Sequence, residues 1–286
     1  MIADDIKCLH VELSSKCNAW CPACPRNKNG VGLIDGLIEQ DLPTSKFKEV
    51  IDQFPKLTTI QLCGNYGDPI IATNILEIIS IVKERNLKIQ IHTNGSLRTT
   101  KWWEELGKIL LDVDHDVWFG LDGIDNVHEI YRQGTSYNKI IKNAKAFIQA
   151  GGYATWQFIP YAHNEHQIIK CIKLSQDFGF KKFKLVKLFR NKKVVQHYRT
   201  GKEFELLPPV NIQKMIKMPG IKTAVIPENC MHLSQPSIYL AATGKLSTCC
   251  YFGSSNGVDT VEEILYNKLD LTHKTCLNSC GTKYEN

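Results

Sequence analysis

Hydrophobic and polar residues along positions 1–190 follow two alternating periods. The stretch 87–92 alternates apolar and polar residues as a β-strand does, and the turn-forming stretch 93–95 ends it. The stretch 140–148 spaces its apolar residues along one helix face, and two glycines close it. Both patterns repeat in this part of the chain. We expect strands near 10–13, 57–62, 87–92, 117–121, 153–159 and 183–189, and helices near 43–54, 74–82, 102–110, 140–148 and 168–178.

Strands that alternate with helices predict right-handed crossovers and a parallel sheet. A complete barrel of this kind has eight units and usually a longer chain, whereas this pattern has six strands. The predicted fold class is therefore α/β, a partial (βα)6 TIM-like barrel of parallel strands. Functional side chains gather at the carboxyl ends of the strands in such architectures. The turn-like motifs of this chain fall at those ends, at 17–24, 64–69, 93–95 and 122–123.

The pattern changes after residue 190. Residues 191–220 show weak periodicity and contain Pro208-Pro209, so we interpret them as a connector. From residue 221 onward the remaining five cysteines appear, and two alternating stretches, 237–240 and 245–249, predict a hairpin that turns at Gly244. We therefore predict a barrel at 1–190, a connector at 191–220 and a small cysteine-rich β-hairpin/helix module at 221–286.

Composition narrows the compartment and the partners. No run of about 18 apolar residues is present, so no membrane partner is expected. The first residues lack the basic and apolar parts of a secretory signal, which predicts a reducing, cytoplasmic protein. In that compartment, 11 cysteines favour metal or cluster ligation over disulfides. The net charge of +6 and the basic run 181–193 are compatible with nucleic-acid binding, but we favour a solvated strand with basic flanks.

Three cysteines, Cys17, Cys21 and Cys24, follow the first apolar stretch in a CxxxCxxC spacing. Thiolates hold iron–sulfur clusters, and three on one loop can ligate three irons of a four-iron cluster. The fourth iron is then open to a substrate or cofactor. The spacing alone leaves two alternatives. One is a structural zinc site with His10 as the only close fourth ligand, and the other is three buried thiols that pack as small apolar residues.

This loop resembles the cluster-binding loop of the radical S-adenosylmethionine (radical SAM) enzymes. The resemblance implies a catalytic [4Fe-4S] cluster on the three cysteines and S-adenosylmethionine bound to the open iron. It also implies reductive cleavage of that cofactor to a 5′-deoxyadenosyl radical. One position departs from the family pattern, because the residue before the third cysteine is usually aromatic and here is Ala23. The backbone of Ala23 would then meet the adenine.

Further motifs occur in the family's order between residues 9 and 190. The stretch 64–69 resembles the glycine-rich GGEP motif, with an aspartate in place of the usual glutamate. The stretches 93–95 and 121–123 resemble the family's TNG and LDG segments, and 132–134 resembles its R-x-G element, whose arginine pairs with the cofactor carboxylate. Alone, each is a common turn signal or a surface arginine. The cofactor-binding residues that the resemblance implies are Ala23, Gly64, Gly67, Asp68, Thr93, Asn94, Asp122, Arg132 and Asn164.

The C-terminal cysteines form a second pattern. Thirteen residues separate Cys230 from Gly244, and four more separate Gly244 from Cys249, which resembles the opening of the SPASM and twitch modules of radical SAM enzymes. The cysteine count suits the shorter twitch form, which holds one auxiliary [4Fe-4S] cluster. Cys250 could replace Cys249, and a structural four-cysteine zinc site remains an alternative. The implied ligands are Cys230, Cys249, Cys276 and Cys280, while Cys8, Cys63 and Cys171 are interpreted as buried thiols.

The resemblance implies an oxidoreductase-type radical SAM enzyme. It would abstract a hydrogen atom from a small molecule or peptide, with the auxiliary cluster as electron acceptor and flavodoxin or ferredoxin as one-electron donor. Two alternatives stay open, namely radical SAM modification of a nucleotide or nucleic acid, and a non-catalytic zinc-binding protein.

Overall fold

The computed structural model describes residues 3–186, 194–210, 222–224, 236–252 and 257–266. The contacts between residues divide the chain into two units. The first unit contains residues 1–16, 38–90 and 226–286, and the second contains residues 17–37 and 91–225. The chain passes from the first unit to the second within strand β5 (Lys88–Thr93).

The first unit is built on a short sheet in the order β4-β1-β12-β13. Strand β1 (Cys8–Val11) pairs in parallel with both β4 (Thr59–Leu62) and β12 (Ser237–Leu240). Leu9 and Val11 lie on the same face of β1 and are fully buried, whereas Cys8 and His10 on its other face are partly buried. The remaining elements are η1 (Ala3–Asp5), α1 (Thr44–Ile51), η2 (Pro69–Ile71), α2 (Ile75–Glu84), β13 (Leu246–Ser247), η4 (Cys250–Phe252) and α9 (Val261–Tyr266).

The predicted hairpin near the C-terminus is confirmed. Strand β13 runs antiparallel to β12, with Tyr239 opposite Ser247. The sequence pattern did not predict that β12 also extends the sheet beside β1. A local pattern reports how a strand turns back on itself, whereas its partner more than 200 residues away depends on long-range packing.

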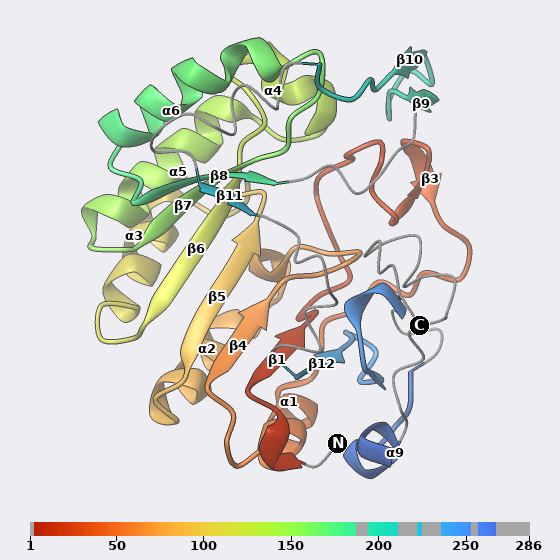
Figure 1. Ribbon diagram of the computed structural model, residues 1–286, viewed down its shortest axis with the longest axis vertical. Coiled ribbons are helices and arrows are strands. Elements are labelled where there is room, and N and C mark those ends of the chain that lie inside the picture. Colours follow the sequence, from red (N-terminus) through yellow and green to blue (C-terminus); the bar gives the residue numbers. More distant parts are fainter. Residues whose placement is uncertain (1–2, 187–193, 211–221, 225–235, 253–256, 267–286) are drawn as a thin grey trace, which may run out of the picture. The chain divides into compact units, whose positions relative to one another are not determined.

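The second unit carries the parallel strands β6 (His115–Gly120), β7 (Ala154–Phe158), β8 (Lys182–Val186) and β11 (Lys222–Ala224), in that order. Helices α3 (Thr100–Ile109), α5 (Tyr137–Gln149) and α6 (Ile168–Asp177) cover one face of them (Figure 1). The buried Trp103 ring packs against Phe119 and Phe147, with centroids 5.0 and 6.1 Å away. The remaining elements are β2 (Asn27–Lys28), β3 (Val31–Leu33), α4 (Asn126–Tyr131), η3 (Glu165–Gln167), β9 (Val194–Gln196) and β10 (Glu203–Glu205).

These elements confirm the predicted α/β fold with mostly parallel strands, and the strands of the described part do not close into a barrel. The last predicted strand, 183–189, is observed as β8, and residues 187–193 lie outside the described part. Helix α4 and the two-stranded pairs β2–β3 and β9–β10 were not predicted. Within the described ranges, no helix is both long enough and apolar enough to cross a membrane.

Candidate functional site

The three cysteines of the 17–24 loop share one apolar environment in the second unit. Cys21 is 8% exposed and belongs to a buried cluster, and the half-buried Cys17 and Cys24 pack against that cluster. The loop is held by its backbone, since the N–H of Cys24 donates to the carbonyl of Cys21 at 2.9 Å. The side chains that form the cluster with Cys21 are Ala19, Ala23, Tyr131, Tyr161, Val195 and Leu206.

This donor set fits an iron–sulfur cluster better than a single metal ion. Among the residues that the structure describes, no three His, Cys, Asp or Glu side chains stand close enough to hold one ion. A cubane cluster does not need that convergence, because each thiolate ligates its own iron. The candidate fourth zinc ligand, His10, has its Nε2 hydrogen-bonded to the carbonyl of Cys63, and burial lowers the His10 pKa to about 4. A thiol-only, apolar-lined loop therefore suits a cluster.

The stretch that follows strand β5 meets the cysteine loop. The Nδ2 of Asn94 lies 3.8 Å from the Sγ of Cys17 and donates to the Oδ1 of Asn18 at 2.9 Å. Asn18 in turn donates to the Oγ of Ser96 at 2.8 Å, and Ser96 donates back to Asn94 at 2.6 Å. The closed ring of three side chains fixes an amide N–H beside a predicted cluster ligand. Thr93 stabilises the turn itself, because its Oγ1 accepts a hydrogen bond from the backbone N–H of Gly95.

A buried ion pair joins the ends of β6 and the 132–134 element. The Nε of Arg132 lies 2.5 Å from the Oδ2 of Asp122, whose side chain is fully buried. The other oxygen of Asp122 accepts from the N–H of Ile159 at 2.7 Å. Burial raises the pKa of Asp122, and the charge of Arg132 acts against that rise. Burial alone would lower the pKa of Arg132, but Asp122 and neighbouring groups outweigh it and the pKa rises.

The guanidinium of Arg132 rests on a strand end that has no side chain. A Cβ built on Gly120 would lie 2.7 Å from Nη2 and 3.0 Å from Nη1 of Arg132. Gly120 therefore leaves the space in which the two Nη groups lie, while Nε is engaged by Asp122. The arrangement leaves a planar two-nitrogen edge that matches a carboxylate.

His128, which the sequence analysis missed, orders this element. Its Nδ1 accepts from the backbone N–H of Asp122 at 3.1 Å, so the ring proton is on Nε2 and donates to the Oγ1 of Thr135 at 3.0 Å. The hydroxyl of Thr135 donates in turn to the carbonyl of Arg132 at 2.6 Å. Burial and the charge of Arg132 lower the His128 pKa to about 3, which keeps the ring neutral. The signal available in the sequence was a histidine six residues after Asp122 of the LDG-like turn.

Asn164 is fully buried and acts on backbone groups. Its Nδ2 donates to the carbonyls of Asp122 and Ile159, both at 3.0 Å, and its Oδ1 accepts from the N–H of Tyr161 at 2.7 Å. The side chain thus ties the end of β6 to the segment after β7.

The glycine-rich turn lies in the first unit. A Cβ on Gly67 would lie 1.9 Å from the carbonyl oxygen of Ser14, so only glycine lets the turn pack there. The N–H of Asp68 donates to the carbonyl of Lys16, the residue before Cys17, at 2.9 Å. The carboxylate of Asp68 accepts from the N–H of Ile70 at 3.1 Å as the cap of η2.

Gly64 is fixed by the same turn and by a buried acid that the sequence analysis missed. A Cβ on Gly64 would lie 2.4 Å from the carbonyl oxygen of Gly67 and 3.0 Å from Glu12. Glu12 is 2% exposed and accepts from the N–H of Tyr66 at 2.6 Å and from the hydroxyl of Tyr239 at 2.8 Å. Burial raises the pKa of Glu12 against these hydrogen bonds.

The second cysteine pattern is only partly within the described residues. Cys249 and Cys250 are half-buried thiols in the first unit, next to β13. The Oγ of Ser247 donates to the carbonyl of Cys249 at 2.9 Å, and Asn65 donates to the carbonyl of Cys250. Cys230, Cys276 and Cys280 lie outside the described residues, so the four-ligand set stays a prediction.

The other cysteines agree in part with their interpretation as buried thiols. Cys171 is fully buried, and burial raises its pKa to about 12. Cys8 and Cys63 are half-buried, and burial raises the pKa of Cys8 to about 11. Thiols with raised pKa values are poor metal ligands, because a ligand must be deprotonated.

Comparison with known proteins finds a matching family and several relatives. The family model described as the radical SAM superfamily matches residues 11–175. A tungsten-containing aldehyde ferredoxin oxidoreductase cofactor-modifying protein from Pyrococcus furiosus is 28% identical over 45% of this chain and 34% of its own length. PqqA peptide cyclase from Granulibacter bethesdensis is 25% identical over 60% of this chain and 44% of its own. The chain thus spans less than half the length of these curated relatives.

The fold of a solved structure is also similar. The crystal structure of Streptococcus suis SuiB bound to its precursor peptide SuiA matches with a TM-score of 0.65 at 14% identity. The match covers 97% of this chain and 70% of that one. At this identity the likeness concerns the fold.

Proposed function

Since the chain belongs to the radical SAM superfamily, we propose that it binds a [4Fe-4S] cluster through Cys17, Cys21 and Cys24 and cleaves S-adenosylmethionine reductively. When bound, the cluster supplies one electron that breaks the S–C5′ bond and gives a 5′-deoxyadenosyl radical able to take a hydrogen atom from a substrate. The observation that carries this proposal is the packing of three thiols on one apolar cluster.

The chain's own residues have distinct parts in this proposal. Asn94 donates an N–H toward Cys17, and such hydrogen bonds favour the thiolate and tune a cluster. The two Nη groups of Arg132 are suited to the carboxylate of S-adenosylmethionine, with Asp122 holding the guanidinium in place. Asp68 and the turn glycines would receive the ammonium group, and Thr93 and the Ala23 backbone would line the nucleoside side.

We further propose that the net reaction is an oxidation. Cys230, Cys249, Cys276 and Cys280 would hold an auxiliary [4Fe-4S] cluster in a twitch-like domain at 221–286, after a connector at 191–220. A cluster with four protein ligands has no open iron, so electron transfer is its natural role. It would accept the electron that the substrate radical loses.

The substrate that we propose is a peptide. The name of the relative PqqA peptide cyclase indicates a peptide substrate, and the structure of SuiB contains a bound precursor peptide. The face of the second unit's strands that lies opposite the helices carries Thr155, Gln157 and Lys184 together with the Trp118 ring, and these residues alternate with the helix-facing aromatic residues. The Nζ of Lys184 lies 3.8 Å from the centroid of the Trp118 ring. Such a face suits the amide and charged groups of a peptide.

A cofactor-like small molecule is the second candidate, because one relative is named as a cofactor-modifying protein. The nucleic-acid alternative receives less support. Of the basic run 181–193, Lys182 pairs with Asp116 at 3.3 Å and Lys184 stacks on Trp118. Two of its cations are thus engaged within the unit. A cytoplasmic, reducing location is part of the proposal, since thiol ligands and clusters need it.

The test is anaerobic reconstitution followed by iron and sulfide counts and an assay for 5′-deoxyadenosine. Two clusters correspond to about eight irons per chain and one to about four. Cys17→Ala should abolish 5′-deoxyadenosine and remove about four irons, whereas Cys63→Ala, a half-buried thiol outside the proposed ligand sets, should do neither. Zinc without iron in the wild-type protein, or equal behaviour of the two variants, contradicts the proposal.

A further inference from the structure

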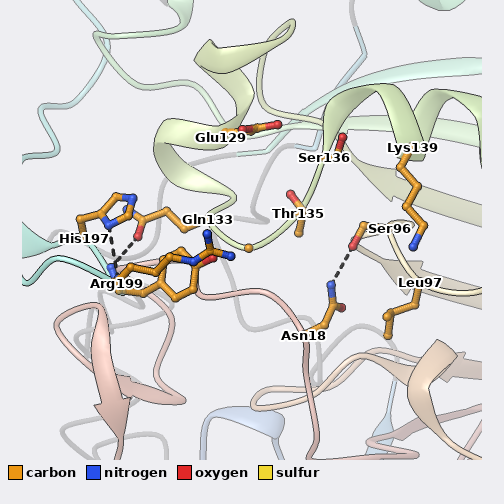
Figure 2. A pocket seen from close by; sticks show the side chains of 12 residues that line it. Asn18, Ser96, Leu97, Glu129, Gln133, Thr135, Ser136, Lys139, His197 and Arg199 are labelled. Carbon is orange, nitrogen blue, oxygen red and sulfur yellow. Dashed lines mark hydrogen bonds between the residues drawn. The ribbon is translucent and has the colours of Figure 1, made fainter.

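A pocket of about 500 Å³ lies beside the cysteine loop in the second unit. Figure 2 shows Asn18 and Ser96 on one side of it and His197 and Arg199 on the other. Asn18 follows Cys17 in the chain, and Asn94 links to both, 2.9 Å from the Oδ1 of Asn18 and 3.8 Å from the Sγ of Cys17. The pocket is therefore one layer of side chains away from a proposed cluster ligand.

A second link runs through aromatic rings. Tyr198, which lines the pocket, stacks on Trp20 of the cysteine loop with centroids 6.0 Å apart and planes inclined by 15°. The N–H of Trp20 donates to the carbonyl of Gln133 at 2.7 Å, and Gln133 accepts from the N–H of Tyr198 at 2.9 Å. The pocket wall and the loop are thus tied by stacking and by hydrogen bonds.

The rim of the pocket is basic where helices usually place acids. Lys139, which lines the pocket, lies in the first turn of α5. That first turn contains no acidic residue. Because a helix N-terminus already carries partial positive charge, a cation there lowers helix stability. Arg199 adds a further positive charge on the opposite wall, against one acidic lining residue, Glu129.

We propose that this pocket and its basic rim are the docking surface of an acidic one-electron carrier protein of the flavodoxin or ferredoxin type. The inference rests on the proposed function, since only a cluster at the 17–24 loop needs that electron. One electron from the reduced carrier would pass through the cluster held by the 17–24 loop to the sulfonium of one S-adenosylmethionine, whose S–C5′ bond would break to give methionine and the 5′-deoxyadenosyl radical. The two cations of the rim favour an acidic partner, and the contacts of Asn94 with Asn18 and Cys17 place the pocket near the proposed cluster ligand.

The test compares two double charge reversals in the reconstituted full chain. Lys139→Glu with Arg199→Glu alters the rim, and Lys170→Glu with Lys173→Glu makes the same charge change on exposed positions of α6. Two quantities are measured. The first is the Kd of oxidised flavodoxin by calorimetry, with a ferredoxin as second probe. The second is the 5′-deoxyadenosine rate with reduced carrier and, separately, with dithionite.

We expect the rim variant to bind the carrier at least about tenfold more weakly than the control at about 0.05 M salt. The difference should largely vanish at about 0.5 M salt, where charges are screened within a few ångströms. The carrier-driven rate should fall in parallel, and the dithionite-driven rate should stay within about twofold of the wild type.

Other outcomes overturn the inference. If the two double variants bind the carriers equally, the docking surface is elsewhere on the chain. If neither carrier binds the wild type, the chain has no such docking surface. In both cases, product formed with dithionite still supports the proposed function. Equal loss of both rates in the rim variant would mean a structural role. Absence of dithionite-driven product from an iron-loaded wild type removes the proposed function and the inference together.

Discussion

Asp122→Asn tests how strongly the buried ion pair holds the site together. The substitution keeps the size of the side chain but leaves the Arg132 guanidinium, whose side chain is 14% exposed, without its anion. Removing one partner of a buried pair costs about 3–5 kcal/mol because a charge stays buried and uncompensated. For a chain of 286 residues that cost corresponds to a fall of roughly 5–8 °C in the unfolding midpoint.

The matched control is Asp116→Asn, which also neutralises a buried aspartate of the same unit. Its partner Lys182 is 32% exposed at 3.3 Å, so water can replace the lost anion. We expect a loss of about 1 kcal/mol or less there. Thermal unfolding of the cluster-free protein at pH 7 measures both. A double variant, Asp122→Asn with Arg132→Leu, should recover part of the loss, because neither charge then remains buried. Equal midpoints for the two single variants would refute the reasoning.

Three further predictions follow from the same contacts. His128→Gln should weaken the fold at pH 7 yet flatten its acid sensitivity. The wild-type ring has a pKa of about 3 and binds a proton on unfolding below about pH 6.5, so its stabilising effect is lost by about 1.4 kcal/mol per pH unit as the pH falls toward 3. Urea titrations at pH 5 and 7 would show it. Gly67→Ala should cost more than about 2 kcal/mol, since its Cβ would meet the carbonyl of Ser14 at 1.9 Å, and midpoints in urea would measure that cost. Asn94→Leu should make a cluster at Cys17 harder to reduce, because a hydrogen bond to the sulfur is lost, as an EPR-monitored potential titration would reveal.

The order of elements in the second unit was accessible from the sequence because the signals are local. The apolar face of 140–148 and the two following glycines predict α5, and the alternation of 87–92 predicts β5. The place of β12 beside β1 was not accessible. Nothing within 237–240 distinguishes a strand of a separate module from one that pairs with residues 8–11, since both need the same apolar residues.

The candidate site shows the same division between local and distant information. The cysteine spacing and the TNG-like stretch are visible in the sequence, but that Asn94 lies 3.8 Å from the Sγ of Cys17 is seen only in the fold. The roles of individual polar groups depended on partners far along the chain. Asn164 serves backbone carbonyls up to 42 residues away, and Glu12 serves Tyr239, 227 residues away. A motif shows which residue types are present, but the hydrogen-bond partner of each side chain is known only from the fold.

Several polar side chains of the second unit already have hydrogen-bond partners within the protein, and this limits which of their atoms can bind a cofactor. Asp122 is committed on both oxygens, to Arg132 and to Ile159. His128 is committed on both ring nitrogens and is neutral. The guanidinium of Arg132 is held at Nε, with its Nη edge over the bare end of β6 at Gly120. Asp122 therefore orients the guanidinium of Arg132 and does not itself bind a ligand. The ligand group that the guanidinium suits is an anion such as a carboxylate.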